Sequence, residues 1–392
     1  MPLPFPPLAL ARRAGNGTRT RDPNLGKVVL YQLSYSRVHR KVRERRTVGQ
    51  AHAVPCQHYL SLMNDVVSLA AELLATPSTT RDEGAVVDLV ARWLVARDWN
   101  VTVQEVTPGR GNVWASRKGG GVTLSTHLDT VPPYVPPRRE DGRLYGRGAC
   151  DAKGIAAAMM IAAERLAADG EKRVDLLLVV GEERGSDGAR AANQLPATSR
   201  WLINGEPTES ILASGCKGAQ RVIVRTRGKE AHSAYPHLGE SAIAPMLRML
   251  PELDALALPT DAVLGPTTVN VGLISGGTEA NIVPGACEAE MMVRLVGDVA
   301  PVKVILDRWA KGRAELEYGS FIPAQHFHTV PGFKSAPVAY TSDIPLLTNW
   351  GKPLLFGPGS IHVAHTTEEF VSEEELRASV DAYISLVRGL LG

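Results

Sequence analysis

The stretch Arg173–Glu183 reads RVDLLLVVGEE and is almost continuously apolar from Val174 to Val180. A strand that alternates apolar and polar residues has one face in water, whereas a continuous apolar run is typical of a parallel strand covered on both faces. A glycine and two adjacent carboxylates follow the run. We therefore expect a buried central strand with Glu182 and Glu183 at its carboxyl end.

The segments around this strand alternate between helical and extended patterns. Helical apolar spacing covers residues 65–75, 83–99, 154–170 and 372–391, and strand patterns cover 100–106 and 121–130. Strands that alternate with helices predict an α/β fold, with a mixed or mostly parallel sheet flanked by helices. In open sheets of this kind, ligands bind at the carboxyl ends of the strands.

The pattern changes after residue 214. Residues 215–318 read as alternating strands around one helical stretch, which suggests an inserted α+β domain. Residues 319–392 then return to the α/β pattern. We expect a first domain in two parts, 63–214 and 319–392, interrupted by the insert.

Length and composition limit the class of protein. The 392 residues suit two domains, the net charge is +2, and no apolar run approaches the length that spans a membrane. The cysteines are far apart, which predicts free thiols in a reducing compartment: Cys56, Cys150, Cys216 and Cys287. Cys150 lacks a flanking base, which disfavours a nucleophilic role. We expect a cytoplasmic protein with no membrane or nucleic-acid partner.

The N-terminal residues 1–62 are strongly basic, with 11 Lys and Arg against 2 Asp and Glu. A nucleic-acid arm or an organelle-targeting segment would have this charge. A third interpretation fits better, because Leu30–Tyr35 can be encoded by the reverse complement of a sequence that resembles a transfer RNA D-arm. We therefore expect residues 1–62 to be a non-native or disordered extension, with Met63 as the natural start.

The segment STHLDT places His127 and Asp129 two residues apart at the end of a predicted strand. Side chains at i and i+2 of a strand share a face, so these two can converge on one point. The pair is either a metal ligand with its orienting carboxylate or a solvated strand end.

Further histidines and acids occupy strand ends or glycine-rich turns. They are Asp151, Glu182, Glu183, Glu206 and His365. Together with His127 they offer two imidazoles and several carboxylates, a ligand set that suits Zn²⁺, Co²⁺ or Mn²⁺. Taken singly, each has an ordinary alternative, such as a solvated histidine, a surface pair of glutamates or an aspartate that bonds its own turn. Spacing alone does not bring them together.

Seven motifs occur in order from about residue 63 to the C-terminus: THLDTVP, GRGACDAKG, GEERGS, NGEPTE, KEAHSAYPHLG, SGGTEANIVPG and GPGSIHVAHTTEE. Together they resemble the acetylornithine deacetylase, succinyl-diaminopimelate desuccinylase and carboxypeptidase family of co-catalytic metallohydrolases. The resemblance implies a zinc-exopeptidase-like catalytic domain and an inserted dimerisation or lid domain. It also implies a homodimer that forms through the insert.

The resemblance implies two divalent metal ions, with zinc expected and cobalt or manganese as alternatives. The ligands it implies are His127 and Glu206 for one ion, Glu183 and His365 for the other, and Asp151 as the bridge. A bridging carboxylate can hold two cations close enough to share one hydroxide.

Catalytic roles follow from the same resemblance. Glu182 is expected to be the general base, and Asp129 is expected to accept the ring N–H of His127 and fix its tautomer. Because successive strand residues point to opposite sides, Glu183 can bind metal while Glu182 faces the water.

In the insert, the resemblance implies that His232 reaches the site of a neighbouring subunit and stabilises the oxyanion. A surface strand residue is the alternative. Asn281 and Arg294 are implied substrate contacts, and Arg294 suits a bidentate grip on a carboxylate. Its alternative is an ion pair with Glu288 or Glu290.

The loop GPGS at 357–360 is expected to approach the substrate closely, with Gly359 as a contact, although a generic turn would have the same sequence.

The expected function is a two-metal amidohydrolase that removes the acyl group from a small N-acyl amino acid in amino-acid biosynthesis. N-acetylornithine is the first choice of substrate and N-acetyl-lysine follows closely. Desuccinylase, dipeptidase and carboxypeptidase activities share the machinery and remain open. A metal-free binding or scaffold homologue is the hypothesis from another class, and the intact ligand set disfavours it.

Overall fold

A computed structural model describes residues 65–392 together with a short strand, β1 (Leu30–Gln32). Strand β1 pairs antiparallel with β2 (Asn100–Thr107). Apart from those three residues, the N-terminal extension expected over 1–62 lies outside the described part of the chain.

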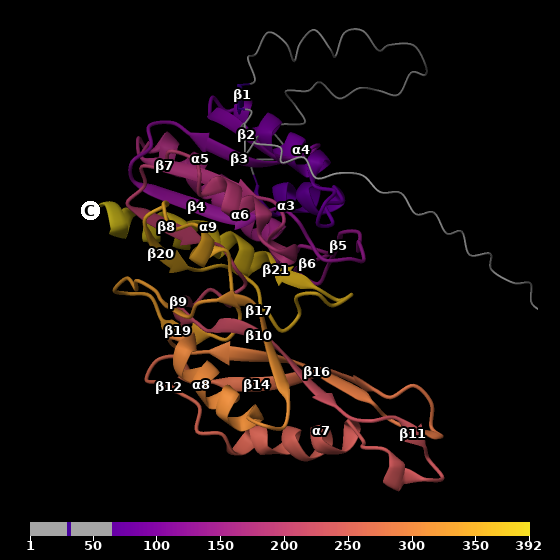
Figure 1. Cartoon of the computed structure of the whole chain (residues 1–392). Helices are drawn as coiled ribbons and strands as arrows, with labels where there is room; N and C mark the ends of the chain where they lie inside the picture. The colour runs from indigo at the N-terminus through magenta and orange to yellow at the C-terminus, as the bar shows by residue number, and fades with distance from the viewer. Residues whose placement is uncertain (1–29, 33–64) are drawn as a thin grey trace, which may run out of the picture.

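The first sheet has seven strands in the order β1-β2-β3-β7-β4-β8-β20. Its central strands are parallel: β7 (Val174–Val179), β4 (Val122–His127), β8 (Trp201–Asn204) and β20 (Lys352–Leu355). Strand β3 (Arg110–Ser116) runs antiparallel to both β2 and β7. This mixed sheet, flanked by helices, confirms the α/β class predicted from the sequence (Figure 1).

The continuous apolar run of β7 is explained by two cores, one on each face of the sheet. Leu176 and Leu178 belong to a core with the helices α3 (Val66–Ala75), α4 (Gly84–Val95), α5 (Lys153–Ala168) and α9 (Glu373–Leu391). Leu177 and Val179 belong to a second core with α6 (Asp187–Ala192). All six residues of β7 are buried, as expected of a strand covered on both faces.

The longest of these helices has clear end signals. The Ser372 side chain at the start of α9 accepts a hydrogen bond from the Glu375 N–H, and three glutamates occupy the first turn. Arg388 lies in the last turn, so both ends suit the helix dipole. Helix α9 packs against α5, the helix that follows Asp151, and therefore supports the loop that carries this residue.

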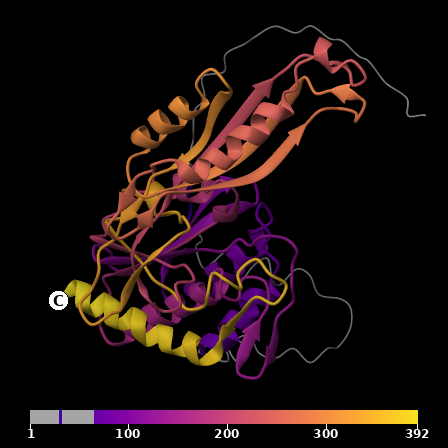
Figure 2. The ribbon, with the colours of Figure 1, turned by 90° about the horizontal axis from the view of Figure 1, so that it is seen from below.

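The second sheet has four antiparallel strands in the order β14-β16-β10-β17. Its strands are β10 (Gly218–Arg227), β14 (Thr268–Gly276), β16 (Ala286–Leu295) and β17 (Glu315–Ile322). Helices α7 (Ile243–Met249) and α8 (Val299–Ala310) contribute to one apolar core with it. In Figures 1 and 2 this unit extends away from the seven-stranded sheet.

The expectation of one helical stretch in the insert was wrong, because α8 is a second helix. Asp298 caps it by accepting from the Ala300 N–H, and Pro301 falls in its first turn, where a proline is tolerated. Val302, Leu306 and Trp309 then face the core at helical spacing. Pro301 hides this helical spacing in the sequence, because a proline inside a helical pattern usually marks the end of a helix.

Short strands complete the fold. Strands β9 (Leu212–Cys216), β18 (Gln325–His326) and β19 (Ser335–Val338) form a small sheet at the junction of the two units (Figure 1). Strands β5 (Arg138–Glu140), β6 (Arg143–Tyr145) and β21 (Phe370–Ser372) form another beside α9. Strand β11 (Ala231–His232) pairs with β15 (Ile282–Val283) at the far tip of the insert, and β12 (Thr260–Asp261) pairs with β13 (Gly265–Pro266). Among the described residues, no helix combines the length and apolarity that a membrane crossing requires.

Candidate metal centre

Three neighbouring parallel strands deliver their following residues to one edge of the first sheet. Strand β4 ends at His127, β7 is followed by Glu182 and Glu183, and β8 is followed by Glu206. Asp151 lies in the turn before α5, and His365 lies in the loop after β20. The residues predicted from separate motifs are therefore brought to one place, at the carboxyl ends of the strands.

Two groups of potential metal ligands share Asp151. The ligand atoms of His127, Asp151 and Glu206 lie within 4.8 Å of one another, and so do those of Asp151, Glu183 and His365. Asp151 Oδ1 lies 3.0 Å from His127 Nε2, while its Oδ2 lies 3.2 Å from His365 Nε2. Each oxygen of this carboxylate therefore faces a different imidazole, as a bridge between two cations requires.

The chemistry of these side chains fits divalent cations. Glu206 is buried, and its Oε1 has no hydrogen-bond partner in the described part of the chain, although a buried oxygen normally has one. Burial, followed by repulsion from Glu182, raises the pKa of Glu206 well above its usual value. A cation would satisfy the orphaned oxygen and offset the repulsion, and two imidazoles with three carboxylates suit zinc-like ions.

Asp129 holds the site in a different way from the one expected. Nδ1 of His127 lies 2.9 Å from the backbone oxygen of Asp129 and 3.5 Å from its Oδ1, so the carbonyl makes the closer contact. The carboxylate accepts instead from Thr80 Oγ1 at 2.8 Å and from the N–H groups of Glu182 and Glu183 at 3.0 and 3.2 Å. Burial favours a higher pKa for Asp129, but His127 and these donors outweigh burial and lower it.

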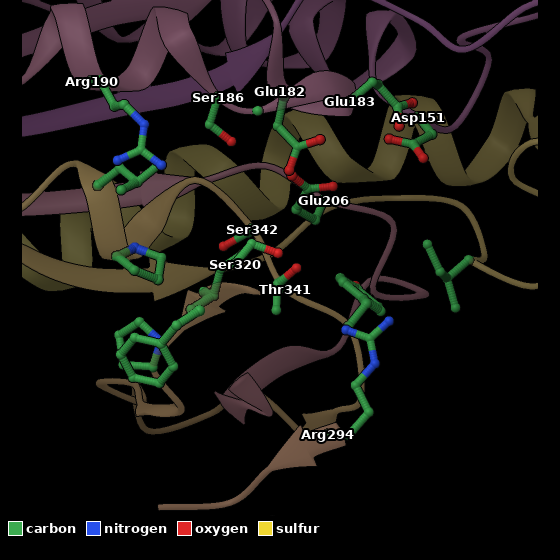
Figure 3. A pocket seen from close by; sticks show the side chains of 18 of the residues that line it. Asp151, Glu182, Glu183, Ser186, Arg190, Glu206, Arg294, Ser320, Thr341 and Ser342 are labelled. Carbon is green, nitrogen blue, oxygen red and sulfur yellow. The ribbon is translucent and has the colours of Figure 1, made fainter. Parts of the chain in front are cut away.

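Glu182 and Glu183 do not continue the strand, so the argument from strand alternation was wrong. Both lie in a 3₁₀ turn, η1 (Glu182–Arg184), that follows Gly181 at φ 78°. A glycine tolerates this left-handed conformation and permits the sharp turn after β7. With three residues per turn, the two side chains still diverge. Glu183 lies beside Asp151, whereas Glu182 points towards Glu206 (Figure 3).

The electrostatic surroundings of Glu182 suit a proton acceptor. Partial burial, followed by the negative charge of Asp343, raises the pKa of Glu182 well above its usual value. A carboxylate with a raised pKa is a stronger base near neutral pH. Asp343 is fully buried and comes from the segment TSDIP, which the sequence analysis read only as part of the α/β pattern.

His365 is held in an unusual backbone conformation. Its φ of 65° is left-handed, which is uncommon for a residue other than glycine. Its Nε2 lies 3.0 Å from Glu183 Oε1, and hydrogen bonds to Asp151 and Glu183 raise its pKa to about 10. In the metal-free chain this imidazole is therefore protonated at neutral pH.

A cavity of about 490 Å³ opens over these ligands. Its lining includes the acids and His365, together with the apolar side chains of Phe321, Ile322 and Leu346. Arg190 and Arg294 also line it, with Arg190 to the left of the acid cluster and Arg294 below it in Figure 3. The sequence analysis did not predict the wall contributed by residues 340–342; the polar Thr341–Ser342 pair after an apolar stretch was the available signal.

Arg294 lines this cavity from β16. Its expected alternative, an ion pair with Glu288 or Glu290, was wrong. Glu290 pairs with Arg221 at 2.5 Å and Glu288 pairs with Arg225 at 2.7 Å. Within residues 65–392, Arg294 has no carboxylate partner within ion-pair distance, which leaves its guanidinium available to an anionic group in the cavity.

The remaining predicted residues do not line the cavity of their own chain. His232 and Asn281 are exposed on β11 and beside β15, at the far tip of the insert (Figure 1), where the Ser233 N–H donates to the Asn281 oxygen at 2.9 Å. Gly359 lies at φ 86° and its N–H donates to Glu375 Oε1 at 3.0 Å. It packs against Cys150 and is absent from the cavity lining, so its role as a substrate contact stays a prediction.

Comparisons with known proteins agree with this arrangement. The family model of peptidase family M20/M25/M40 matches residues 123–389. A peptidase M20 domain-containing protein of Schizosaccharomyces pombe is 36% identical over 344 residues, covering 84% of this chain and 86% of the relative. A probable carboxypeptidase of Emericella nidulans is 34% identical, covering 85% and 89%.

Solved structures share the fold. A tripeptidase from Staphylococcus aureus matches with a TM-score of 0.70 and 19% identity, covering 83% of this chain and 98% of that one. An M20 family metallo-carboxypeptidase from Sulfolobus solfataricus matches with a TM-score of 0.65 and 17% identity, covering 83% and 99%. A dinuclear metal binding peptidase of Bacillus subtilis matches with a TM-score of 0.64 and 16% identity, covering 84% and 99%.

Proposed function

Because the chain belongs to peptidase family M20/M25/M40 and is a metal-dependent hydrolase of amide bonds, we propose that it cleaves the amide bond next to a free carboxylate. The observation that carries this proposal is Arg294, a cavity-lining cation without a carboxylate partner among the described residues, in the same cavity as the two ligand groups. A carboxylate held by Arg294 would bring the neighbouring amide towards Glu182 and Asp151.

This chemistry defines a substrate class. The last peptide bond of a peptide and the amide bond of an N-acyl amino acid both lie beside a free carboxylate. The two substrates differ only in the acyl group. We place carboxypeptidase or dipeptidase action first, because relatives at 34% identity are named probable carboxypeptidases. N-acetylornithine, N-acetyl-lysine and succinylated substrates belong to the same class and are separated by assay.

The proposed metal centre uses the ligands in two groups: His127 and Glu206, and Glu183 and His365, with Asp151 shared. Two bound cations, with zinc as the expected metal, would lower the pKa of a water molecule and stabilise negative charge on the reacting oxygens. Glu182 would then accept the proton of the attacking water and deliver it to the leaving nitrogen. The backbone oxygen of Asp129 would keep the proton of His127 on Nδ1, leaving Nε2 directed at the ligands.

A homodimer through the insert is part of the proposal. Strand β14 is an edge of the second sheet and exposes Leu273 and Ile274 at 66% and 50%. An exposed apolar edge strand is suited to pairing with another chain. In such a dimer, His232 of the partner subunit would stabilise the oxyanion, which the tip of the same chain is badly placed to do. The insert predicted over 215–318 would hold the second sheet and its helices, and the last strand of that sheet, β17, continues to Ile322.

The expected compartment is the cytoplasm, because the described cysteines Cys150, Cys216 and Cys287 are all free and buried.

A substrate panel tests the proposal. Purified protein loaded with Zn²⁺ is assayed on dipeptides, their C-terminal amides, N-acetylornithine and N-acetyl-lysine. We expect turnover only where a free carboxylate adjoins the amide. Arg294→Gln should raise KM for these substrates by about 10–100-fold, the loss expected for one charged hydrogen-bonding partner. Arg221→Gln, on the same sheet but paired with Glu290, is the matched control. Equal cleavage of amidated and free dipeptides would exclude the carboxylate requirement.

A further inference from the structure

A fully buried ion pair lies directly behind the metal ligands. Arg147 Nη1 donates to Glu369 Oε2 at 2.7 Å, and each side chain is only 1% exposed. Neither residue lines the cavity, so neither touches a substrate there. Burying two charges has a large desolvation cost, so a buried ion pair is weak evidence for a role in stability. The contacts that the pair makes with its neighbours indicate its role instead.

Glu369 fixes the turn that presents Asp151. Its Oε1 accepts hydrogen bonds from three backbone N–H groups, those of Gly148 at 3.0 Å, Cys150 at 3.3 Å and Asp151 at 3.2 Å. A carboxylate that collects several N–H groups sets the path of the backbone around it. The backbone of Asp151 is therefore anchored on one side while its carboxylate faces the two imidazoles on the other.

Arg147 connects two further ligand loops to the same point. Its Nη2 donates to the backbone oxygen of His365 at 3.3 Å, and its Nε donates to that of Pro133 at 3.2 Å. Pro133 follows His127 by six residues, and His365 is the residue held at φ 65°. A planar guanidinium can serve three acceptors in fixed directions, whereas a lysine ammonium acts as a flexible point charge.

We propose that Arg147 and Glu369 form a positioning pair that sets the affinity of both cation positions at once. Glu369 orients Asp151, which both ligand groups share. Arg147 holds His365 and the loop after His127 at fixed positions relative to Asp151. The pair acts through the ligands and takes no part in the chemical step. This inference rests on the proposed metal centre and assigns a role to two residues that hold no metal themselves.

The test is a titration of the metal-free protein with Co²⁺, in which binding is measured by visible absorption and by calorimetry. The variants are Arg147→Lys, which keeps the buried positive charge, and Glu369→Gln, which keeps an acceptor oxygen. Leu94→Ala is the matched control, because it truncates a fully buried side chain of α4, a helix that supplies no ligand. Thermal melts of all the metal-free proteins show how much each change affects stability.

We expect the wild type to bind two Co²⁺, and Arg147→Lys and Glu369→Gln each to weaken both binding steps by about 10–100-fold. The Co²⁺ spectrum should change in both variants, whereas Leu94→Ala should melt earlier yet bind Co²⁺ as the wild type does. Wild-type affinity and spectrum in Arg147→Lys would overturn the inference, even where Glu369→Gln fails to fold. If the wild type bound fewer than two Co²⁺, the result would instead overturn the proposed metal centre on which this inference rests.

Discussion

The backbone oxygen of Asp129 lies 2.9 Å from Nδ1 of His127, nearer than the Asp129 carboxylate at 3.5 Å. One residue therefore orients two parts of the site, because its carbonyl faces the imidazole while its carboxylate holds the turn of Glu182 and Glu183. This aspartate couples His127, a proposed metal ligand, to Glu182, the proposed base, which accounts for a histidine and a carboxylate two residues apart at the end of β4.

Asp129→Ala should therefore lower both metal affinity and kcat, by about 10–100-fold each, because the backbone N–H groups of Glu182 and Glu183 lose their acceptor. Thr80→Val removes only one of the donors to this carboxylate and should have a much smaller effect. Metal titration and steady-state kinetics on both variants measure the difference. If Asp129→Ala matched Thr80→Val in both quantities, the carboxylate would not be holding the turn.

Glu182→Gln should keep both metals and lose turnover by about 10²–10⁴-fold, the usual contribution of a general base. Glu183→Gln is the control, because it alters a predicted ligand on the same 3₁₀ turn and should lose metal as well as activity. Metal analysis by mass spectrometry alongside kcat separates the two roles. Near-normal kcat in metal-loaded Glu182→Gln would remove Glu182 from the chemical step.

Metal binding should strengthen as pH rises. The pKa of His365 is raised to about 10 by Asp151 and Glu183. Burial favours a lower pKa for His127, but its carboxylate partners outweigh burial and raise it, whereas burial itself raises the pKa of Glu206. Cations must displace these protons, so a lower pH favours the protonated, metal-free chain. Zn²⁺ binding at neutral pH should therefore release protons. Calorimetry in buffers of different ionisation enthalpy counts them, and pH-independent affinity would contradict these shifts.

Leu273→Glu should convert a dimer to a monomer, because it places a charge on the exposed apolar edge strand β14. Val304→Glu is the control, since Val304 is similarly exposed at 57% but lies on helix α8. Sedimentation of both variants at several concentrations gives the oligomeric state. A dimer that persists in Leu273→Glu would move the interface elsewhere.

Mixed dimers test whether His232 acts across the interface. Glu182→Gln and His232→Ala are each expected to be nearly inactive alone. After random exchange of subunits in equal amounts, one site in each mixed dimer regains both an intact base and an intact partner histidine. About a quarter of wild-type activity should then return. Activity that stays at the level of the separate variants would contradict action in trans.

The sequence predicted the layers of the fold better than the local geometry of the site. Continuous burial of β7 follows from its apolar run. The sequence analysis identified no strand before Glu206, and it is β8 that places this residue at the edge reached by His127. The 3₁₀ turn at Glu182 could not be read from GEE alone, because a glycine permits several backbone paths.

Contacts between distant segments were beyond the sequence patterns. Arg147 and Glu369 are 222 residues apart, and nothing in either motif indicates that they meet. The unpaired state of Arg294 depends on which arginines bind Glu288 and Glu290, and that choice is set by strand register in the second sheet.

The central claim is that Asp151 lies between two cations, one bound with His127 and Glu206 and the other with Glu183 and His365. Anomalous diffraction from crystals grown with Zn²⁺ tests it most directly. The account predicts two zinc peaks, one on each side of Asp151, each in contact with its own imidazole. A single peak, or peaks that do not touch Asp151, would contradict it.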